Sequence, residues 1–270
     1  MSVLTDTFTI AGDVQIPKVA FGTWQIPDGS EAYDSVRTAL DTGYRHIDTA
    51  LAYGNEESVG RAVRDSGVDR DTIFITTKLP AEIKTADGAR QAFEKSQSGL
   101  DLGVVDLYLI HAPWPWNAIG SDHRDGNIEV WKVFEELYSS GRARSIGVSN
   151  FDVDDLESLT AATDVVPHAN QIRWFVGNTQ DETTAWCQQR GVLVEGYSPL
   201  ATGELLEGGK LDAIAKRVGR TPAQVALRYL LEKDVLPLPK SVTPERIREN
   251  ADLDFTLDAD AIVELDAIRD

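Results

Sequence analysis

Short apolar runs rich in β-branched residues alternate along the chain with longer stretches that mix apolar and polar positions. Each run has the length of a buried strand, and each longer stretch leaves room for a helix. No linker rich in Pro, Gly or Ser divides the chain. The pattern predicts eight strands, at residues 19–23, 46–50, 73–79, 105–111, 145–150, 169–172, 193–198 and 236–240.

The stretches between these runs carry helix signals. Within residues 32–40 the apolar side chains recur on one face of a helix, which Gly43 would end. Thr221 and Pro222 form a typical helix start. The apolar face of that second helix would consist of Val225, Leu227, Leu230 and Leu231.

Repeated strand–helix units in one uninterrupted chain fit a (β/α)8 TIM barrel best. We therefore expect an α/β fold of one domain, residues 1–270, with a short C-terminal tail. The segments TFTIAG and VQIPK predict an N-terminal β-hairpin. A doubly wound sheet is the alternative, but the chain has neither G-x-G-x-x-G nor G-x-x-x-x-G-K-[ST]. Any nucleotide would therefore be bound in another way.

The charge of the chain restricts its partners. Its 44 acidic and 26 basic residues give a net charge of −18, which would repel a phosphate backbone, so we expect no nucleic acid partner. Arginine outnumbers lysine by 17 to 9. Dispersed acidity with few lysines resembles the surfaces of proteins from very salty cytoplasm, where salt screens self-repulsion. A moderately acidic mesophilic protein is the alternative.

Other features of the composition bear on the compartment. No apolar run approaches the ~20 residues of a membrane-spanning helix. The segment MSVLTDTFTIAGD lacks the basic and apolar regions of a signal peptide, so we expect a cytoplasmic protein without a membrane partner. Cys187 is the only cysteine, which excludes disulfides within the chain and cysteine-based zinc sites.

Polar or aromatic groups end nearly every predicted strand, and the active site of a barrel lies at these ends. Alone, Asp48 could cap a helical turn, Lys78 could be a solvated lysine, His111 a hydrogen-bonded core histidine, and Tyr53 a packing residue. In a barrel all four would meet around one pocket. The groups at the strand ends are Gly22, Thr23, Trp24, Asp48, Lys78, His111, Ser149, Asn150, Gln171, Tyr197, Ser198, Lys240 and Ser241.

Seven segments of the chain resemble the aldo-keto reductase family in matching order, over residues 21–269. They are GYRHIDTALAYGNE, ITTKL, VDLYLIHAP, SIGVSNF, NQI, GYSPL and LPKSVTPERIREN. The chain is most similar to short prokaryotic members of the 2,5-diketogluconate reductase type. The resemblance implies a single barrel domain that reduces an aldehyde or ketone to an alcohol by hydride transfer.

The resemblance implies Tyr53 as proton donor, Lys78 and Asp48 as the residues that tune it, and His111 as the group that orients the carbonyl. Free tyrosine has a pKa of ~10 and is a poor acid at neutral pH. An ammonium ~4 Å away is worth about 4 kcal/mol at an effective dielectric constant of about 20. That is roughly 3 pKa units, enough to bring the pKa of Tyr53 near 7. Burial and Asp48 oppose this shift, so we expect a smaller lowering.

The resemblance also implies NADPH/NADP+ as cofactor, with NADH a weaker possibility. Ser149, Asn150 and Gln171 would hold the nicotinamide carboxamide, and Tyr197 would stack on its ring. Ser198 and Leu200 would border the pyrophosphate, and Gly22, Thr23 and Trp24 are further candidate cofactor-binding residues. The adenosine 2′-phosphate and adenine would lie against Lys240, Ser241, Val242, Thr243, Arg246, Glu249 and Asn250. Arginine contact with a phosphate favours NADPH over NADH. A solvated basic helix start is the plainer interpretation of this last segment.

The substrate pocket is less well determined. Trp24, Trp114 and Trp116 are candidate substrate-binding residues beside His111, and Trp174 could also wall the pocket, although each could instead pack. Ala112, Arg173 and Trp174 depart from the pattern common in the family. We expect the long C-terminal loop of larger members to be absent. Small aldehydes, α-dicarbonyls, keto sugars and ketoacids all fit. We expect a monomer that acts on a small carbonyl compound.

Two alternatives compete with the reductase interpretation. A metal-dependent hydrolase could use His46 and Asp48, which are two residues apart on one strand, together with His111. A barrel without catalytic activity could bind NADPH and report redox state to a partner. The complete set of Asp48, Tyr53, Lys78 and His111 argues against the second alternative, because a sensor need not keep an acid.

Overall fold

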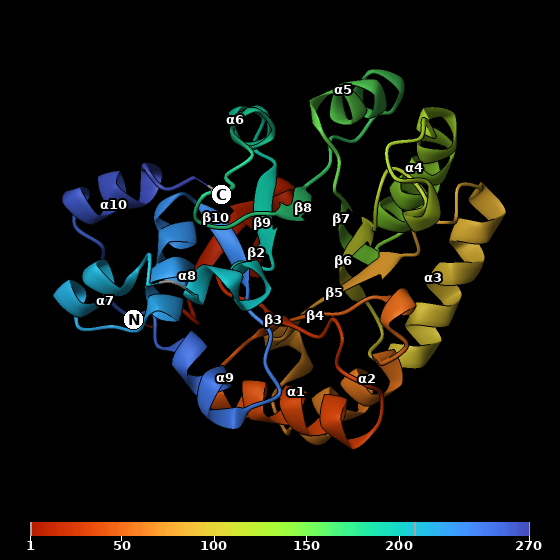
Figure 1. Ribbon diagram of the computed structural model, residues 1–270. Helices are drawn as coiled ribbons and strands as arrows, with labels where there is room; N and C mark the ends of the chain where they lie inside the picture. The colour runs from red at the N-terminus through yellow and green to blue at the C-terminus, as the bar shows by residue number, and fades with distance from the viewer. Residues whose placement is uncertain (1, 208, 270) are drawn as a thin grey trace.

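Eight parallel strands form a nearly closed barrel in the computed structural model, which describes residues 2–207 and 209–269 (Figure 1). Each strand pairs with the next in chain order. The N–H groups of Ala20 and Gly22 donate to Pro237 O and Pro239 O at 3.1 and 3.0 Å, which joins the first strand to the last. The strands are β3 (Phe21–Gly22), β4 (His46–Asp48), β5 (Phe74–Leu79), β6 (Val105–Ile110), β7 (Ala143–Ser149), β8 (Ala169–Arg173), β9 (Leu193–Tyr197) and β10 (Val235–Leu238). The predicted TIM barrel is confirmed.

A hairpin covers the N-terminal end of this barrel. Strands β1 (Thr7–Ile10) and β2 (Val14–Pro17) pair antiparallel, as predicted, around Gly12 and Asp13, whose φ angles are +73° and +58°. Ile10 and Ile16 of the hairpin pack with Phe74, Ala169 and Leu193, which lie at the starts of barrel strands. The hairpin therefore leaves only the opposite end of the barrel open for a site.

Helices surround the barrel (Figure 1). They are α1 (Ser30–Thr42), α2 (Glu56–Asp65), α3 (Ala86–Leu100), α4 (Arg124–Ser139), α5 (Val153–Ala162), α6 (Asp181–Gln189), α7 (Asp212–Val218), α8 (Pro222–Glu232), α9 (Pro244–Ala251) and α10 (Ala259–Asp266). Both predicted helix signals are confirmed. Gly43 ends α1 in a left-handed conformation at φ +113°, and Thr221 begins α8 with a capping box that includes Gln224. No helix in the described ranges is long and apolar enough to cross a membrane.

The helix that follows the turn with Tyr53 lies very close to its neighbour. A Cβ added to Gly60 of α2 would overlap the backbone of Leu100 at the end of α3. Glycine therefore permits a backbone contact here that any other residue would push apart. This contact fixes α2, and with it the preceding turn, against the helix that follows β5.

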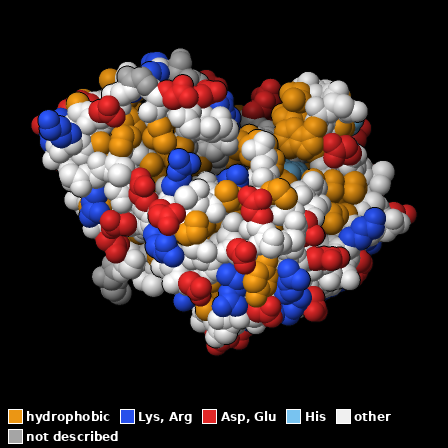
Figure 2. Space-filling view, turned by 60° about the horizontal axis from the view of Figure 1, so that its bottom comes forward, with side chains coloured by type: hydrophobic (Ala, Val, Ile, Leu, Met, Phe, Trp, Pro, Cys, Tyr) orange, Lys and Arg blue, Asp and Glu red, His pale blue; other side chains and the backbone are white. Residues whose placement is uncertain are grey.

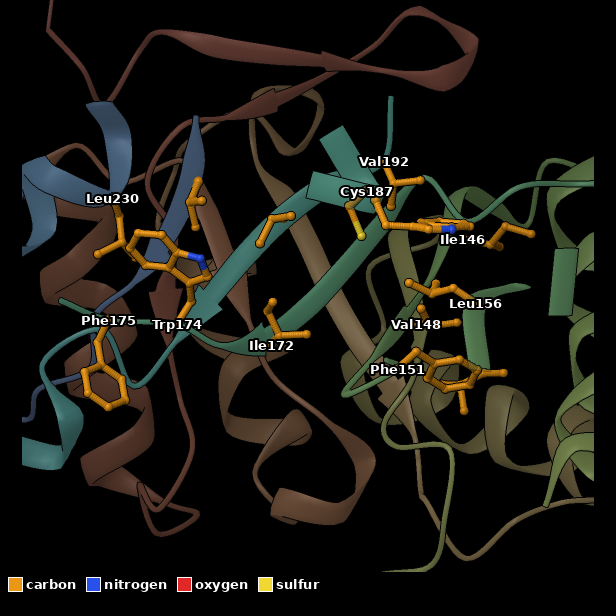
Figure 3. Close-up of a cluster of buried hydrophobic side chains, with 14 of the residues drawn as sticks. Ile146, Val148, Phe151, Leu156, Ile172, Trp174, Phe175, Cys187, Val192 and Leu230 are labelled. Carbon is orange, nitrogen blue, oxygen red and sulfur yellow. The ribbon is translucent and has the colours of Figure 1, made fainter. Parts of the chain in front are cut away.

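The largest apolar layer lies between the strands and the outer helices. Val148 and Ile172 of neighbouring strands point into it, beside Leu156 of α5 and Cys187 of α6 (Figure 3). On the outer surface, acidic side chains are spread over the face shown in Figure 2, among fewer basic ones, and hydrophobic side chains border a hollow in that face.

Trp174 belongs to the apolar layer between the strands and the outer helices, and not to a pocket wall. Its side chain is 1% exposed, and its indole Nε1 donates to Thr184 Oγ1 at 3.1 Å. It packs near Leu230 and Tyr229 of α8 (Figure 3). The suggestion that Trp174 walls the substrate pocket is therefore wrong, because the residue after the end of β8 points outward toward the helices.

Candidate active site

The four predicted catalytic side chains meet at the C-terminal end of the barrel. Asp48 is the last residue of β4, Lys78 lies near the end of β5, and His111 directly follows β6. Tyr53 lies in the short 3-10 helix η2 (Leu51–Tyr53) after β4. Because neighbouring parallel strands end at one edge, residues far apart in sequence come together here.

Lys78 has contacts with both Asp48 and Tyr53. Its side chain is fully buried, and its Nζ lies 2.7 and 2.8 Å from the two carboxylate oxygens of Asp48. It also donates to Thr49 O at 2.9 Å and approaches the Tyr53 hydroxyl at 3.4 Å. An ammonium has three N–H groups, so the long fourth contact is the weakest. Lys78 is thus held mainly by Asp48 and Thr49 and faces Tyr53.

The pKa values of Lys78 and Tyr53 depend on two opposing effects, burial and the neighbouring charges. Burial alone would lower the pKa of the Lys78 ammonium, but the negative charge of Asp48 and the hydrogen bonds that Lys78 donates to it raise that pKa above its ordinary value. Lys78 is therefore charged at neutral pH.

The pKa of the Tyr53 phenol is raised, mainly by burial, although Lys78 acts to lower it. Asp48 adds to the increase. The expected net lowering of the Tyr53 pKa is therefore wrong for the free protein. The reason is that Asp48 offsets much of the ammonium's charge and burial disfavours a phenolate. Tyr53 holds its proton throughout the neutral range.

His111 completes the group as a neutral imidazole. Its Nε2 lies 3.5 Å from the Tyr53 hydroxyl, and the two rings meet edge to face at 5.5 Å between centroids. Burial, and then the charge of Lys78, lowers the pKa of His111 to about 3. His111 therefore acts here as a hydrogen-bonding group and not as a cation.

Gln171 connects this group to an acid that the sequence did not reveal. Its Nε2 donates to Asp48 Oδ2 at 2.9 Å and to Glu195 Oε2 at 2.8 Å. Glu195 lies on β9, two residues before Tyr197, and is fully buried. The predicted site residues lie at strand ends, whereas Glu195 lies in the middle of the strand LVEGY. Such a charge in an otherwise apolar strand was the signal that could have found it.

Three of the predicted nicotinamide-binding residues form a connected polar surface with Gln171. The Tyr197 hydroxyl donates to Asn150 Oδ1 at 2.8 Å, and Asn150 Nδ2 donates to Ser149 Oγ at 3.0 Å. Ser149 Oγ in turn donates to Gln171 O at 2.7 Å. Asn150 has a left-handed φ of +62°, which turns its side chain toward this set. Hydroxyl and amide groups of this kind suit a carboxamide.

The predicted phosphate-binding segment presents free cations. Within the described residues, no carboxylate lies within 4.0 Å of Lys240 or Arg246, although acidic residues greatly outnumber basic ones. Both side chains are exposed, and Arg246 lies in the first half of α9. The Thr243 side chain makes no capping hydrogen bond at the start of this helix. An anionic group would therefore find unpaired donors here.

The other predicted cofactor residues lie around these two areas. Thr23 is fully buried, and its hydroxyl donates to Asp48 O at 3.0 Å, so its side chain supports the backbone of β4. The hydroxyl of Ser241 accepts a hydrogen bond from Thr243 N at 3.1 Å. Gly22 ends β3, Ser198 and Leu200 follow β9, and Val242 is exposed, whereas Glu249 is half-buried and Asn250 is buried in α9.

Aromatic side chains stand beside His111. Trp116 meets the His111 ring edge to face at 5.5 Å, and Trp114 meets Trp116 in the same way at 5.2 Å. Trp24 and Trp116 are 47% and 40% exposed, which is unusual because tryptophan side chains are highly buried on average. Of the predicted substrate-binding residues, Trp116 therefore lies against His111, with Trp114 next to Trp116.

The geometry gives little support to a metal centre. Within residues 2–207 and 209–269, no three His, Cys, Asp or Glu side chains are grouped so that they could hold a metal ion. His46 Nε2 instead forms a hydrogen bond with Thr76 Oγ1 at 2.8 Å, and its side chain is fully buried.

Comparison with known proteins gives a consistent picture. The model of the Aldo/keto reductase family matches residues 18–270. The chain is 40% identical to a glyoxal reductase of Bacillus subtilis, over 98% of this chain and 94% of that protein. It is 38% identical to an aldehyde reductase of Saccharomyces cerevisiae, over 94% and 88% of the two chains.

Solved structures agree with these sequence matches. An aldo/keto reductase from Brucella melitensis superposes with a TM-score of 0.90 at 40% identity, covering 97% of this chain and 98% of that one. An aldo-keto reductase from a Medee basin deep-sea metagenome library gives a TM-score of 0.92 at 36% identity, over 97% and 95%.

The low pKa of His111 has a consequence for stability. Its pKa of about 3 lies below the ordinary 6.5, so between these values the unfolded chain binds more protons than the folded one. The free energy of unfolding therefore falls as the pH falls through this window. When the pH is lowered from 7 to 5, the free energy of unfolding of His111→Asn should therefore rise by about 2 kcal/mol relative to that of wild type. Chemical denaturation at both pH values measures this difference, and a constant difference would show that His111 titrates normally.

Proposed function

The chain belongs to the aldo/keto reductase family of oxidoreductases, and on this basis we propose that it is an NADPH-dependent carbonyl reductase with Tyr53 as proton donor. One observation carries the proposal. A buried ammonium, held by the Asp48 carboxylate at 2.7 Å, lies 3.4 Å from the Tyr53 hydroxyl, with the neutral His111 imidazole on the other side. This arrangement is suited to giving a proton to a reacting oxygen.

The residues present fit a nicotinamide cofactor. Ser149, Asn150 and Gln171 would hold its carboxamide, and the half-buried ring of Tyr197 would lie against the nicotinamide. Lys240 and Arg246, which have no acidic partner in the described chain, would hold the 2′-phosphate. NADPH bound there would supply the hydride that reduces the carbonyl carbon.

Tyr53 would protonate the carbonyl oxygen as that oxygen gains negative charge. The raised pKa of the phenol keeps the proton in place until the reaction makes the oxygen a much stronger base than a phenolate. The ammonium of Lys78 then stabilises the phenolate that forms. A lowered pKa in the resting protein is therefore not needed.

His111 would fix the position of the carbonyl oxygen. Because Nε2 of this neutral ring lies 3.5 Å from the Tyr53 hydroxyl, an oxygen within reach of Tyr53 is also within reach of His111. A cation at this position would repel Lys78, which is one reason the imidazole is neutral. Orientation of this kind lowers the entropy cost of the reaction.

The proposed substrates are small aldehydes, α-dicarbonyls and keto sugars. The exposed rings of Trp24 and Trp116 would contact the apolar part of such a molecule, with Trp114 behind Trp116. Two relatives are named for glyoxal and aldehyde reduction, which supports this range. We further propose that residues 1–270 act as one domain and as a monomer.

Replacing Tyr53 tests the proton donor. Tyr53→Phe should reduce NADPH-dependent carbonyl reduction by roughly 10²-fold or more, because the acid is lost. NADPH should still quench tryptophan fluorescence in this variant. Tyr33→Phe is a matched control, because the Tyr33 hydroxyl of α1 donates a hydrogen bond to Asp65 of α2 on the outside of the barrel. A panel of small aldehydes and dicarbonyls, assayed at low and at molar salt, provides the measurement. Unchanged turnover of Tyr53→Phe would refute this role.

Replacing Arg246 tests the choice of cofactor. Arg246→Ala should raise the KM for NADPH about tenfold or more and leave that for NADH nearly unchanged, because a charge-assisted contact with the 2′-phosphate is lost. Arg248→Ala, two residues along the same helix and also exposed, is the control and should have little effect. Equal changes for both cofactors would show that Arg246 does not read the 2′-phosphate.

A further inference from the structure

Glu195 is a buried acid with a single hydrogen-bond partner in the described part of the chain. It lies in the middle of β9 (Leu193–Tyr197) and is 0% exposed. Its Oε2 accepts a hydrogen bond from Gln171 Nε2 at 2.8 Å, and its Oε1 is buried without a hydrogen-bond partner among the described residues. No Lys, Arg or His nitrogen in the described chain lies within 4.0 Å of it. The contact that defines Glu195 is therefore the one with Gln171.

This contact determines which way the Gln171 amide faces. The amide nitrogen carries two N–H groups, and Asp48 Oδ2 at 2.9 Å and Glu195 Oε2 at 2.8 Å accept both. Turning the amide over would place its carbonyl oxygen against two acceptors. Within the described chain no donor bonds Gln171 Oε1, so one orientation is fixed and one acceptor remains.

Burial of the Glu195 carboxylate costs desolvation free energy, so packing alone does not explain why an acid lies at this position. Burial, followed by the charge of Asp48, raises the pKa of Glu195 to about 7, while the Gln171 hydrogen bond and Lys78 oppose this. A well-packed apolar side chain at this position would avoid the desolvation cost. The neighbouring residues of β9, Leu193 and Val194, are both buried and apolar.

We propose that Glu195 is a positioning residue: with Asp48 it holds the Gln171 amide so that only Oε1 is offered to a ligand. An acceptor at this place selects an N–H donor, which the carboxamide of a nicotinamide supplies. The proposal rests on the proposed function, because it assigns the ligand of Gln171 to that cofactor. It extends that function by placing part of the cofactor's recognition in the interior of the barrel.

Two substitutions separate the hydrogen bond that Glu195 accepts from Gln171 from the negative charge of Glu195. Glu195→Gln keeps the length and an acceptor oxygen but removes the charge. Glu195→Asp keeps the charge but withdraws the acceptor by one methylene. We expect Glu195→Gln to bind NADPH within about threefold of wild type, and Glu195→Asp to bind about tenfold more weakly. The dissociation constant is measured by quenching of tryptophan fluorescence, without turnover.

The same pair at Glu56 provides the control. Glu56 is also a buried acid, 5% exposed, but it accepts its hydrogen bond from Thr77 and does not contact Gln171. Glu56→Gln and Glu56→Asp should leave the dissociation constant unchanged while lowering thermal stability. Circular dichroism and thermal unfolding of all four variants establish that each is folded before its binding is compared.

A double-mutant cycle shows whether Glu195 acts through Gln171. In a Gln171→Met background, Glu195→Asp should have no further effect on NADPH binding, because no amide remains to be held. The cycle measures the coupling between the two residues, so it distinguishes an effect transmitted through Gln171 from a separate effect of Glu195 on the barrel.

The outcomes separate this proposal from the proposed function. If wild type does not bind NADPH, the proposed function fails and this proposal fails with it. If wild type binds and Glu195→Asp binds equally well, only the role of Glu195 is refuted. The role of Glu195 would also be refuted if Glu195→Gln weakened NADPH binding as much as Glu195→Asp does. It would be refuted too if Glu195→Asp weakened binding in the Gln171→Met background as much as it does in wild type.

Discussion

The structure depends on the buried ion pair of Lys78 and Asp48. An ammonium with no exposed surface is tolerable only because two carboxylate oxygens and a backbone carbonyl accept from it at 2.7 to 2.9 Å. Removal of one partner from a buried pair typically costs 3–5 kcal/mol. Asp48 and Lys78 belong to neighbouring strands, so the same contact links β4 to β5 and places a cation beside Tyr53.

From this pair, hydrogen bonds cross the barrel interior to its far strands. Asp48 accepts from Gln171 on β8, which also donates to Glu195 on β9. Ser149, Asn150 and Tyr197 extend the same network toward the open end. In the proposed reaction, the proton donor and the cofactor site are thus parts of one connected set of polar groups. A change in charge at one end would be felt at the other, because the interior screens charges weakly.

Much of this could be predicted from sequence, for specific reasons. Gly43 and Thr221 are local signals, so the ends of α1 and α8 were found. The strands end in polar residues, and barrel topology brings Asp48, Lys78 and His111 together. Three features were missed or predicted wrongly. The outward direction of Trp174 depends on packing against α8, and Glu195 has meaning only beside Gln171. The direction of the Tyr53 pKa shift depends on burial that a sequence does not state.

The coupling of Asp48, Lys78 and Tyr53 can be measured as the pKa of one phenol. The chain has 7 tyrosines, and 13C labelling of the tyrosine rings, with Tyr53→Phe to assign the signal, allows Tyr53 to be titrated by NMR. Asp48→Asn removes the charge that raises the Tyr53 pKa and leaves more of the Lys78 ammonium to act on the phenol. The account predicts a lower Tyr53 pKa in Asp48→Asn than in wild type. An unchanged or higher value would contradict it.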